Sequence, residues 1–243
     1  MKYRNVNFKT FLYILLEQMK TVVKISGSVF DEAGAEERIR ELASVFESYV
    51  QDGNSLALVV GGGKRSRELI ELGRKLGATE DVLDEIGIDV TRINAKLLIS
   101  CIKDSYPKVI TDLREADIAW AMKKIPVAGG LSPGHSTNAV AALLAEHLRA
   151  DLFVNSTKAG GVFDRDPKKY PDARLMEKVD VEGLKKIIKG SSEAGTYELL
   201  DEVSIGIIER SRVRTLVTGT GTAEVKKALY GEKVGTMIVF ERI

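Results

Sequence analysis

The sequence reads VVKISGS at residues 22–28, LVVGGGKRSR at residues 58–67 and VAGGLSPGHST at residues 127–137. In each stretch an aliphatic strand runs into glycines, and a helical pattern follows. If the three strands are parallel, their turns lie at the carboxyl edge of one sheet, where open α/β folds bind ligands. Glycine lets main-chain N–H groups approach an anion, and the next helix N-terminus favours negative charge. The three turns therefore predict a site for a polyphosphate or for two phosphorylated ligands.

The remainder of the chain continues this alternation. Further strands are expected at residues 152–155, 215–218 and 236–240, with a short one near Val109. Helices are expected at residues 35–50, 66–76, 90–102, 138–149, 181–189, 199–211 and 223–229, and a hairpin with a loop at residues 156–179. Repeated strand–helix units predict an α/β fold, a three-layer sandwich around a mostly parallel central sheet. No linker is visible, so residues 19–243 are expected to form a single domain of two lobes.

Charge and cysteine content exclude several classes of protein. The 36 Lys and Arg balance 35 Asp and Glu, so neither a nucleic-acid partner nor a membrane partner is expected. A single cysteine, Cys101, allows no internal disulfide, and with two histidines it predicts no zinc site. Cys101 lies in an apolar run and is expected to be buried. These features are typical of the reducing cytoplasm, so we expect a cytoplasmic protein.

The first residues of the chain need a separate interpretation. Residues 8–16 are mainly apolar and follow basic residues, which partly mimics a signal peptide. The run is too short to span a bilayer, and no small-residue cleavage site follows it. From Met19 the chain reads as the start of a core strand. We therefore expect residues 1–18 to be an N-terminal extension outside the fold.

Two familiar phosphate-binding motifs are missing from the sequence. A P-loop needs Ser or Thr after its Gly-Lys pair, but Gly63-Lys64 is followed by Arg65. The dinucleotide fingerprint G-x-G-x-x-G does not occur at the first strand–helix turn, and Gly219-Thr220-Gly221 lacks the third glycine. Neither Walker nor Rossmann chemistry is supported.

Lys24 is a charged residue inside an otherwise apolar first strand. One interpretation is a strand lysine that points to the solvent at the sheet edge. The other is an ammonium group that bridges phosphate oxygens and stabilises charge in a loose transition state. Arg67 begins the helix after the triple glycine, where its guanidinium would reach the same anions, although a solvated helix arginine is the alternative.

The ordered set of motifs KISG, VVGGGKRSR, DEIGID, PVAGGLSPGHST, STKAGGVFDRDPKKY and AGTYELLD resembles the uridylate (UMP) kinases of the amino-acid-kinase superfamily, in their archaeal branch. The resemblance extends from Thr21 to about Arg242. GGG and KISG recur across the superfamily, whereas the whole set is specific. It implies the carbamate-kinase-like fold, with an acceptor-binding lobe at about 19–150 and an ATP-binding lobe at about 151–243. It also implies transfer of the ATP γ-phosphoryl group to UMP in pyrimidine nucleotide biosynthesis.

The resemblance implies roles for residues at matching positions. On the ATP side, the residues at the phosphates would be Lys24, Gly27, Ser28, Gly63 and Arg67, and those at the adenosine would be Thr157, Phe163 and Asp166. On the UMP side, the residues at the base and phosphate would be Gly62, Leu131, Ser132, Pro133, Gly134, His135, Ser136 and Thr137, with Asp84 at the ribose hydroxyls. From the residues alone, Asp84 reads as a surface carboxylate at a helix start, Phe163 as hairpin core, and His135 as a pocket-lining or exposed loop residue rather than a general base.

Three positions depart from the family pattern. Asn138 stands where relatives often carry an aspartate thought to orient the catalytic lysine, Gly160 replaces the aspartate of V-D-G-V, and Gly206 replaces a lysine common in archaeal relatives. Asn138 is also a natural N-cap for its helix. These departures bear on turnover, while the binding residues are retained.

Together these features predict ATP-Mg²⁺ and UMP bound end to end for direct in-line transfer, with no covalent intermediate. Few acidic residues lie in the turns, so Mg²⁺ is expected to be held mainly by phosphates and water. Two alternatives stay open: a sister kinase with another small acceptor, and a nucleotide-binding protein without turnover that serves regulation or storage. The resemblance further implies a homo-oligomer, a hexamer built as a trimer of dimers.

Overall fold

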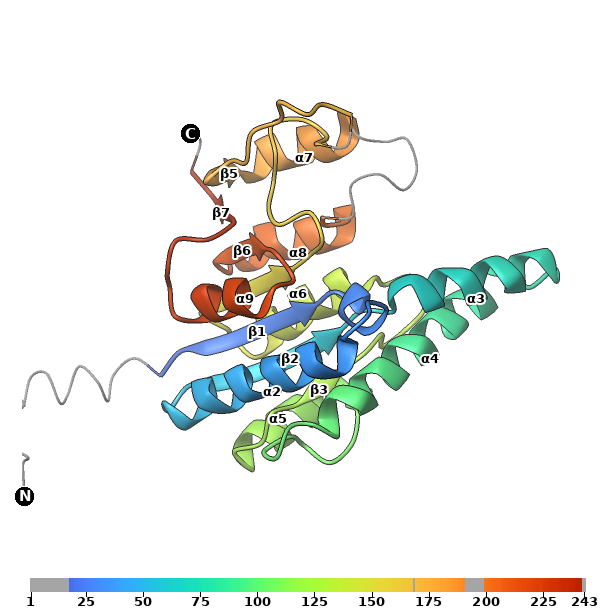
Figure 1. Cartoon of the computed structure of the whole chain (residues 1–243), viewed down its shortest axis with the longest axis vertical. Helices are drawn as coiled ribbons and strands as arrows, with labels where there is room; N and C mark the ends of the chain where they lie inside the picture. The colour runs from blue at the N-terminus through green and yellow to red at the C-terminus, as the bar shows by residue number, and fades with distance from the viewer. Residues whose placement is uncertain (1–17, 168, 191–198, 242–243) are drawn as a thin grey trace, which may run out of the picture.

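The computed structural model describes residues 18–167, 169–190 and 199–241, and these residues form one sheet with helices on both faces (Figure 1). Seven strands make up the sheet in this part of the chain, in the order β3-β2-β1-β4-β6-β7-β5. The strands are β1 (Lys20–Ile25), β2 (Ser55–Val60), β3 (Val127–Ala128), β4 (Leu152–Ser156), β5 (Lys178–Asp180), β6 (Thr215–Thr218) and β7 (Thr236–Val239). Neighbouring strands are parallel except for the antiparallel pair β6–β7. The α/β three-layer prediction is confirmed.

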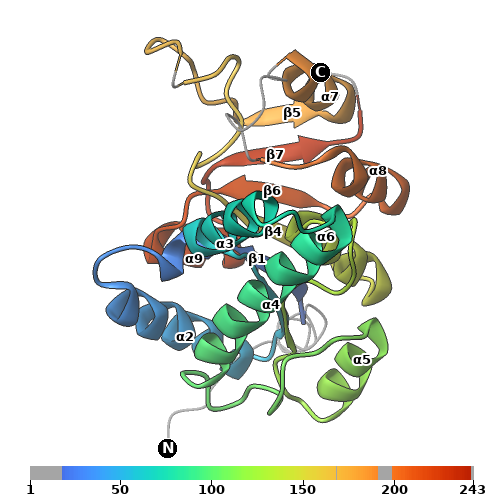
Figure 2. The ribbon, with the colours of Figure 1, turned by 90° about the vertical axis from the view of Figure 1, so that its right-hand side faces the viewer.

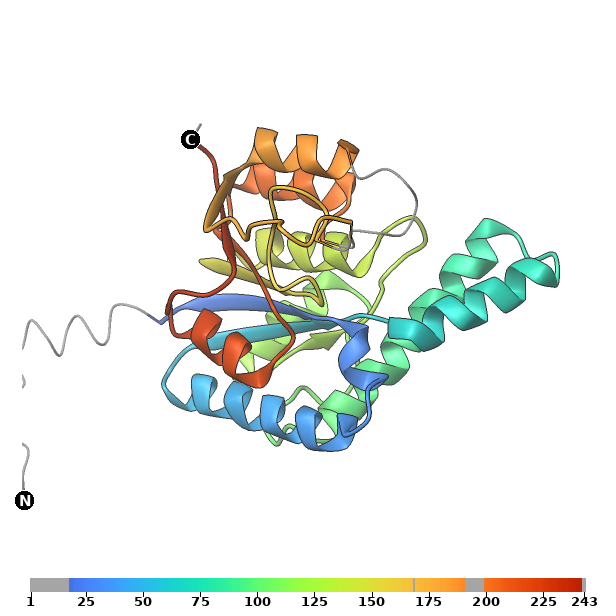
Figure 3. The same cartoon turned by 45° about the horizontal axis from the view of Figure 1, so that its top comes forward.

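The helices divide between the two faces of the sheet (Figures 2 and 3). They are η1 (Gly27–Phe30), α2 (Ala35–Gln51), α3 (Gly63–Lys75), α4 (Glu80–Ile99), α5 (Leu113–Ala121), α6 (Thr137–His147), α7 (Val181–Gly190), α8 (Glu202–Ser211) and α9 (Thr222–Leu229). Residues of α6 and α8 bury one face together with Val22 and Val59. Residues of α2 and α9 bury the other face together with Val23 and Val60. Helices α3 and α4 run side by side and project from the body as a two-helix arm (Figure 3).

The strands at the centre of the sheet are apolar because both of their faces are covered. Five of the six residues of β1 are buried, and so are five of the six residues of β2. Burial on both faces removes the alternation that a half-exposed strand shows. Lys24 is the exception in β1, since it is charged and yet only 8% exposed. The solvent-edge interpretation of Lys24 is therefore wrong.

Several element boundaries differ from the sequence-based expectation. Helix α4 was expected at residues 90–102 but begins at Glu80, because Leu83 and Ile88 continue its buried face across Gly87. Helix α3 begins at Gly63 rather than at residue 66. Helix α8 begins at Glu202, because Asp201 accepts the N–H of Ser204 and caps it. Terminal residues of this kind depend on caps that composition does not reveal.

The edges of the sheet also differ from expectation. Near Val109 the described chain forms no strand but a single parallel bridge from Ile110 to Ala128, and Pro107 in this segment has no N–H for a ladder. Strand β5 was missed inside the segment interpreted as a loop. It pairs with β7 in parallel, through Val179 and Ile238. The hairpin itself is present, since Phe163 bridges Leu175.

The N-terminal segment lies almost wholly outside the described residues, so the expectation for residues 1–18 stays a prediction. The described chain is anchored from Met19, whose N–H donates to Oδ1 of Asn54 (3.1 Å). Cys101 is a free thiol and half-buried rather than fully buried. Among the described helices, none has the length and apolar character that crossing a membrane requires.

Candidate functional site

The first two glycine turns are packed against each other without any side chain between them. Gly27 begins η1 directly after β1, and the turn Gly61–Gly63 follows β2. A Cβ placed on Gly27 would lie 2.5 Å from the carbonyl carbon of Gly62 and 2.6 Å from that of Gly61. Only glycine allows two main chains to approach this closely. The parallel pairing of β1 and β2 thus brings both turns to one place.

Main-chain N–H groups of this paired turn are available for a ligand. Gly61 donates its N–H to the carbonyl of Ile25 (2.9 Å). Within the described part of the chain, the N–H groups of Gly62 and Gly63 form no hydrogen bond, and both residues are half-buried. Gly63 has φ of 72°, a left-handed conformation that favours glycine. Helix α3 starts here, so its positive dipole end points at the same space.

Lys24 lies at the carboxyl end of β1, next to this paired turn. In register it faces Val59 of β2 and Asn155 of β4. Strand residues alternate between the two faces, so Lys24 shares the α6 face with Val22 rather than the α2 face with Val23. The Lys24 side chain is therefore buried at the carboxyl end of its strand. A buried charge needs hydrogen-bonding partners or a ligand.

Helix α4 holds the paired glycine turn from behind through a residue that sequence reasoning missed. The Nδ2 group of Asn94 donates to the carbonyls of Gly61 (2.9 Å) and Gly62 (3.3 Å). Asn94 is only 2% exposed. Its amide fixes the direction of both carbonyls. The signal in the sequence was weak, because Asn on a helix usually lies at the surface.

The same helix holds the third glycine turn, between β3 and α6. The N–H of Gly130 donates to Oγ1 of Thr91 (2.6 Å), which is buried. Arg92 donates to the carbonyls of Gly130 (3.1 Å) and Leu131 (3.2 Å). At the start of the helix, Oδ2 of Asp84 accepts the N–H of Gly134 (2.7 Å). One helix thus ties the triple-glycine turn to the 129–134 turn.

The predicted UMP-side residues 131–137 form a loop that ends in a strong helix cap. Oγ of Ser136 accepts the N–H groups of Asn138 (3.1 Å) and Ala139 (3.0 Å). The N-cap of α6 is therefore Ser136, and the assignment of Asn138 as the cap is wrong. Oγ of Ser136 also donates to Oδ2 of Asp201 (2.5 Å), which caps α8. Two helix N-termini are held together at the carboxyl edge.

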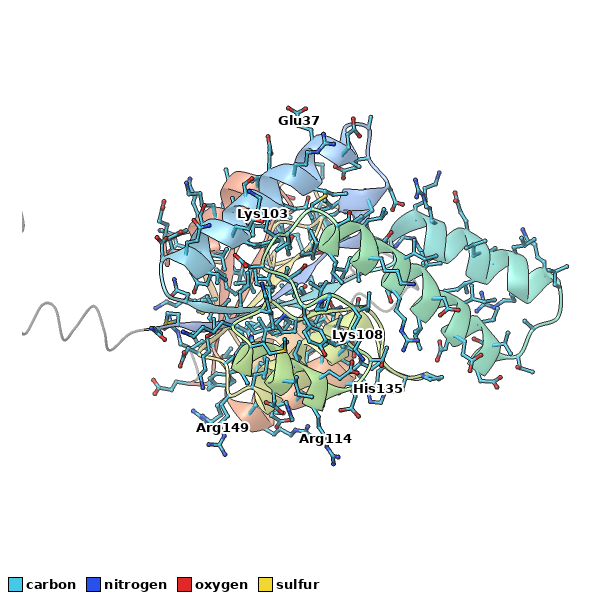
Figure 4. The ribbon with its side chains drawn as sticks, turned by 90° about the horizontal axis from the view of Figure 1, so that it is seen from below. Glu37, Lys103, Lys108, Arg114, His135 and Arg149 are labelled. Carbon is cyan, nitrogen blue, oxygen red and sulfur yellow. The ribbon has the colours of Figure 1, made fainter. Side chains whose placement is uncertain are left out.

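The middle of this loop is exposed. Ser132, Pro133 and His135 lie at the surface, with Leu131 and Thr137 half-buried. The His135 ring contacts Oγ of Ser132 (3.3 Å) and the carbonyl of Pro133 (3.4 Å). Figure 4 shows His135 at the rim of the molecule. This position fits a loop residue rather than a buried general base.

Buried polar atoms without partners gather at the ends of the parallel strands and at the start of α6. They are Oδ1 of Asn138, Oδ1 of Asn155 and Oγ1 of Thr218, and none has a hydrogen-bond partner within the described residues. Asn155 is the register neighbour of Lys24, and Thr218 ends the next strand, β6. Buried polar groups without partners are rare and call for an explanation. A polar ligand at this edge would supply it.

The predicted adenosine-side residues lie along the segment after β4. Thr157 is buried, and its N–H donates to the carbonyl of Thr218 (2.9 Å). Phe163 and Asp166 are half-buried in the hairpin that follows. Arg67 is exposed on α3, about one turn after Gly63. The structure brings Lys24, Gly27, Ser28, Gly62 and Gly63 to one strand edge, and Asp84 to Gly134.

A carboxylate that sequence reasoning missed also reaches the triple-glycine turn. Oδ2 of Asp31 accepts the N–H of Lys64 in the first turn of α3. A side chain at Gly63 would overlap the same carboxylate oxygen. The next residue, Glu32, pairs with Arg38 (3.7 Å) and with Lys158 (3.8 Å). Asp31 lies shortly after the first predicted turn, but its sequence position alone gives no direction for its side chain.

Two further observations concern metal binding and the position of a separate hollow. Within residues 18–167, 169–190 and 199–241, no three His, Cys, Asp or Glu side chains gather in a way that would hold a metal ion. A hollow lined by Arg212, Arg214 and Phe240 lies at the amino edge of β4 and β6, the opposite edge from the glycine turns. The chemistry-bearing turns and this hollow are therefore separate.

The fold and these turns agree with comparison to known proteins. The model of the amino acid kinase family matches residues 19–219, and the chain belongs to this family. The uridylate kinase of Methanothermobacter thermautotrophicus is 43% identical over 226 residues, which cover 92% of this chain and 100% of that protein. The uridylate kinase of Archaeoglobus fulgidus is 44% identical over 222 residues, which cover 90% and 100%.

Solved structures of kinases also match this chain. The crystal structure of uridylate kinase from Archaeoglobus fulgidus matches with a TM-score of 0.82 and 41% identity, covering 91% of this chain and 100% of that one. The crystal structure of aspartate kinase from Synechocystis matches with a TM-score of 0.70 and 20% identity, covering 92% of this chain and 40% of that one. The second likeness concerns the fold alone.

Proposed function

We propose that this chain is an ATP-dependent UMP kinase, which transfers the γ-phosphoryl group of ATP to UMP and releases UDP and ADP. The observation that carries the proposal is the direct packing of the Gly27 turn on Gly61–Gly63 beside buried Lys24. Identity of 43% to a uridylate kinase over the full length of that protein supports UMP as the acceptor. A sister acceptor and a protein without turnover have no observation in their favour.

In the proposed mechanism, the protein positions two phosphates and neutralises charge. The N–H groups of Gly62 and Gly63 would bind phosphate oxygens, and the α3 dipole adds to their effect. Lys24 would follow the charge of the γ-phosphoryl group as it moves from one oxygen to the other. Because phosphoryl transfer has a loose transition state, placement and charge supply most of the catalysis. No covalent intermediate is needed.

Acceptor binding is assigned to the lobe at about 19–150. Asp84 would accept hydrogen bonds from the ribose hydroxyls of UMP, and its existing bond to the N–H of Gly134 (2.7 Å) supports a position beside the acceptor loop. Gly62 and residues 131–137 would surround the base and phosphate. Asn138 carries a buried Oδ1 without a partner in the described residues. In the proposed role, this oxygen would accept from the Lys24 ammonium during the reaction, in place of the aspartate of relatives.

ATP binding is assigned to the lobe at about 151–243 together with the first turn. Gly27, Ser28, Gly63 and Arg67 would contact the phosphates, and Thr157, Phe163 and Asp166 would contact the adenosine. The partnerless hydroxyl of Thr218 at the end of β6 lies next to Thr157 in the ladder, which supports a polar ligand there. The assignment of UMP to one lobe and of ATP to the other is likewise proposed.

Mg²⁺ is proposed to arrive with ATP and to neutralise phosphate charge. The described residues contain no cluster of carboxylates for a metal, and a small hard cation readily keeps phosphates and water as ligands. Held in this way, the ion fits the site without a dedicated protein cage.

We further propose a cytoplasmic homo-oligomer, a hexamer built as a trimer of dimers. Apolar side chains on the two-helix arm support association, since Leu72 and Leu76, one helical turn apart at the end of α3, are 53% and 78% exposed. Neighbouring exposed apolar side chains are typical of protein contacts. Light scattering of the purified chain measures the assembly directly.

A coupled ADP-release assay across nucleoside monophosphates tests the proposed function. Wild-type protein with ATP and Mg²⁺ should release ADP in proportion to added UMP, with AMP and GMP as negative controls. Glutamate derivatives and isopentenyl phosphate test the sister acceptors. Absence of UMP-dependent ADP release, in protein that calorimetry shows to bind both nucleotides, would contradict the proposal.

A further inference from the structure

The Asp31 carboxylate lies at the triple-glycine turn, on the N–H group that follows the two glycine N–H groups proposed to bind phosphate. Asp31 ends η1, and its own N–H donates to the carbonyl of Ser28 (3.1 Å), which fixes its backbone. Its Oδ2 accepts the N–H of Lys64 and lies against Gly63. Asp31 is half-buried, so the carboxylate sits within the turn rather than in bulk solvent.

This contact uses the features that suit the turn to phosphate. Lys64 and Gly63 belong to the first turn of α3, whose N–H groups and dipole attract negative charge. The contact joins two elements that are distant in sequence, because Asp31 follows β1 and Lys64 follows β2. The carboxylate oxygen therefore lies at an N–H group of the helix start that a phosphate oxygen would otherwise contact.

We propose that Asp31 is a specificity-determining residue that excludes free inorganic phosphate from the triple-glycine turn and gives way to a polyphosphate. The proposal rests on the proposed function only in taking this turn as a phosphate site. A tethered group competes at an effective concentration in about the millimolar range, which a separate small anion must match. Inorganic phosphate would have to displace the Asp31 carboxylate and would gain only contacts to the glycine turn in return.

A nucleoside triphosphate differs because it makes additional contacts. Its phosphate chain would also reach the Gly27 turn and Lys24, so its binding offsets the loss of the Asp31 contact. The apparent affinity for any anion is lowered by the fraction of protein in which Asp31 holds the turn. This loss of apparent affinity prevents the binding of a weakly held single phosphate, whereas a tightly held triphosphate still binds. Discrimination follows from this difference.

The experiment compares Asp31→Ala, Asp31→Asn and the control Glu37→Ala by calorimetric titration with inorganic phosphate, without nucleotide. Glu37 also loses one negative charge, but it is exposed on α2 and points to solvent (Figure 4). We expect phosphate to bind at least about fivefold more tightly to Asp31→Ala than to wild type, a difference of about 1 kcal/mol by the relation of tenfold to 1.4 kcal/mol. Asp31→Asn, which keeps an acceptor without the charge, should tighten binding by a smaller factor, and Glu37→Ala should stay within twofold.

A second readout separates this role from a merely structural one. If Asp31 only caps α3, its removal lowers the unfolding midpoint and leaves phosphate binding unchanged or weaker, which would overturn the proposal. We expect a lower midpoint in buffer together with tighter phosphate binding. If Asp31→Ala does not fold, phosphate binding to Asp31→Asn that is no tighter than to Glu37→Ala would overturn the proposal. Phosphate titration involves no turnover, so a wild type that fails to phosphorylate UMP would overturn the proposed function and leave this test intact.

Discussion

Substituting Gly27 by Ala tests the packing on which the whole site depends. In the structure, the added methyl carbon would lie 2.5 Å and 2.6 Å from the carbonyl carbons of Gly62 and Gly61, whereas ordinary contacts lie at 3.4–4 Å. Each of these neighbours is a main-chain atom, so none can rotate aside. The two turns must separate instead.

The size of the effect follows from these distances. The nearest atom to the added methyl carbon is the Gly63 nitrogen at 2.0 Å, so ordinary contact requires a displacement of more than about 1 Å. Overpacking of this kind costs about 1–3 kcal/mol of unfolding free energy. A displacement of about 1 Å in groups that position reactants can cost about 10²-fold in rate. We therefore expect Gly27→Ala to fold with reduced stability and to lose UMP-dependent turnover by about 10²-fold.

Gly206→Ala is a matched control for the same chemical change. Gly206 lies in α8, is exposed, and a Cβ there would meet nothing within 4 Å. Alanine in a helix interior is favoured over glycine by about 0.8–1 kcal/mol. This variant should be as stable as wild type or more stable, with unchanged turnover.

Denaturant unfolding and the ADP-release assay measure both quantities on the two variants. The decisive comparison is between two added methyl groups, of which one has space and one has none. If Gly27→Ala retained turnover within about threefold of Gly206→Ala, well below the about 10²-fold expected from misplacement, the inference that the paired glycine turns form the reaction site would be refuted.

Three other predictions concern single side chains. Lys24→Ala should lower turnover by about 10²-fold or more with little change in UMP affinity, and near-normal turnover in the ADP-release assay would remove its catalytic role. Asn94→Ala leaves the carbonyls of Gly61 and its neighbour without their donor, so unfolding free energy should fall by about 1–3 kcal/mol, and an unchanged denaturation midpoint would contradict this. Tyr230 donates to Asp52 (2.6 Å), which raises the pKa of Tyr230 to about 12. The folded form thus holds its proton longer than the unfolded chain, so this bond stabilises below about pH 10 and is lost as the pH rises through about 12. Tyr230→Phe should flatten that part of the unfolding curve against pH, and an identical curve would disprove the assignment.

Much of the fold could be predicted because strand and helix patterns are local. The glycines after residues 22–25 and 58–60 mark strand ends, and the helix over α2 follows from its spacing of Ile39, Leu42 and Phe46. Boundaries were less certain where a cap or a distant partner decides them. Helix α4 begins ten residues before the predicted start at residue 90, because the buried side chains Leu83 and Ile88 continue one face across Gly87.

Some residues of the candidate site could also be predicted from the sequence, and others could not. The turns, Lys24 and Asp84 could be proposed from sequence, because glycine patterns and family motifs are visible in one dimension. Thr91, Asn94 and Asp31 could not, since each acts on a turn that is distant along the chain. The separation is 39 residues for Thr91 and Gly130, and 33 residues for Asp31 and Lys64.

The amino-acid sequence by itself determined that this protein has parallel strands ending in glycine turns, with a lysine in the first strand. Those features need only local backbone freedom and side-chain periodicity. The tertiary structure alone decided that Gly27 rests on Gly61–Gly63, that Lys24 is buried, and that one helix holds two turns. These relations arise when parallel pairing brings separate strand ends to one edge, and contacts of that kind are set by packing between elements rather than by neighbours in the chain.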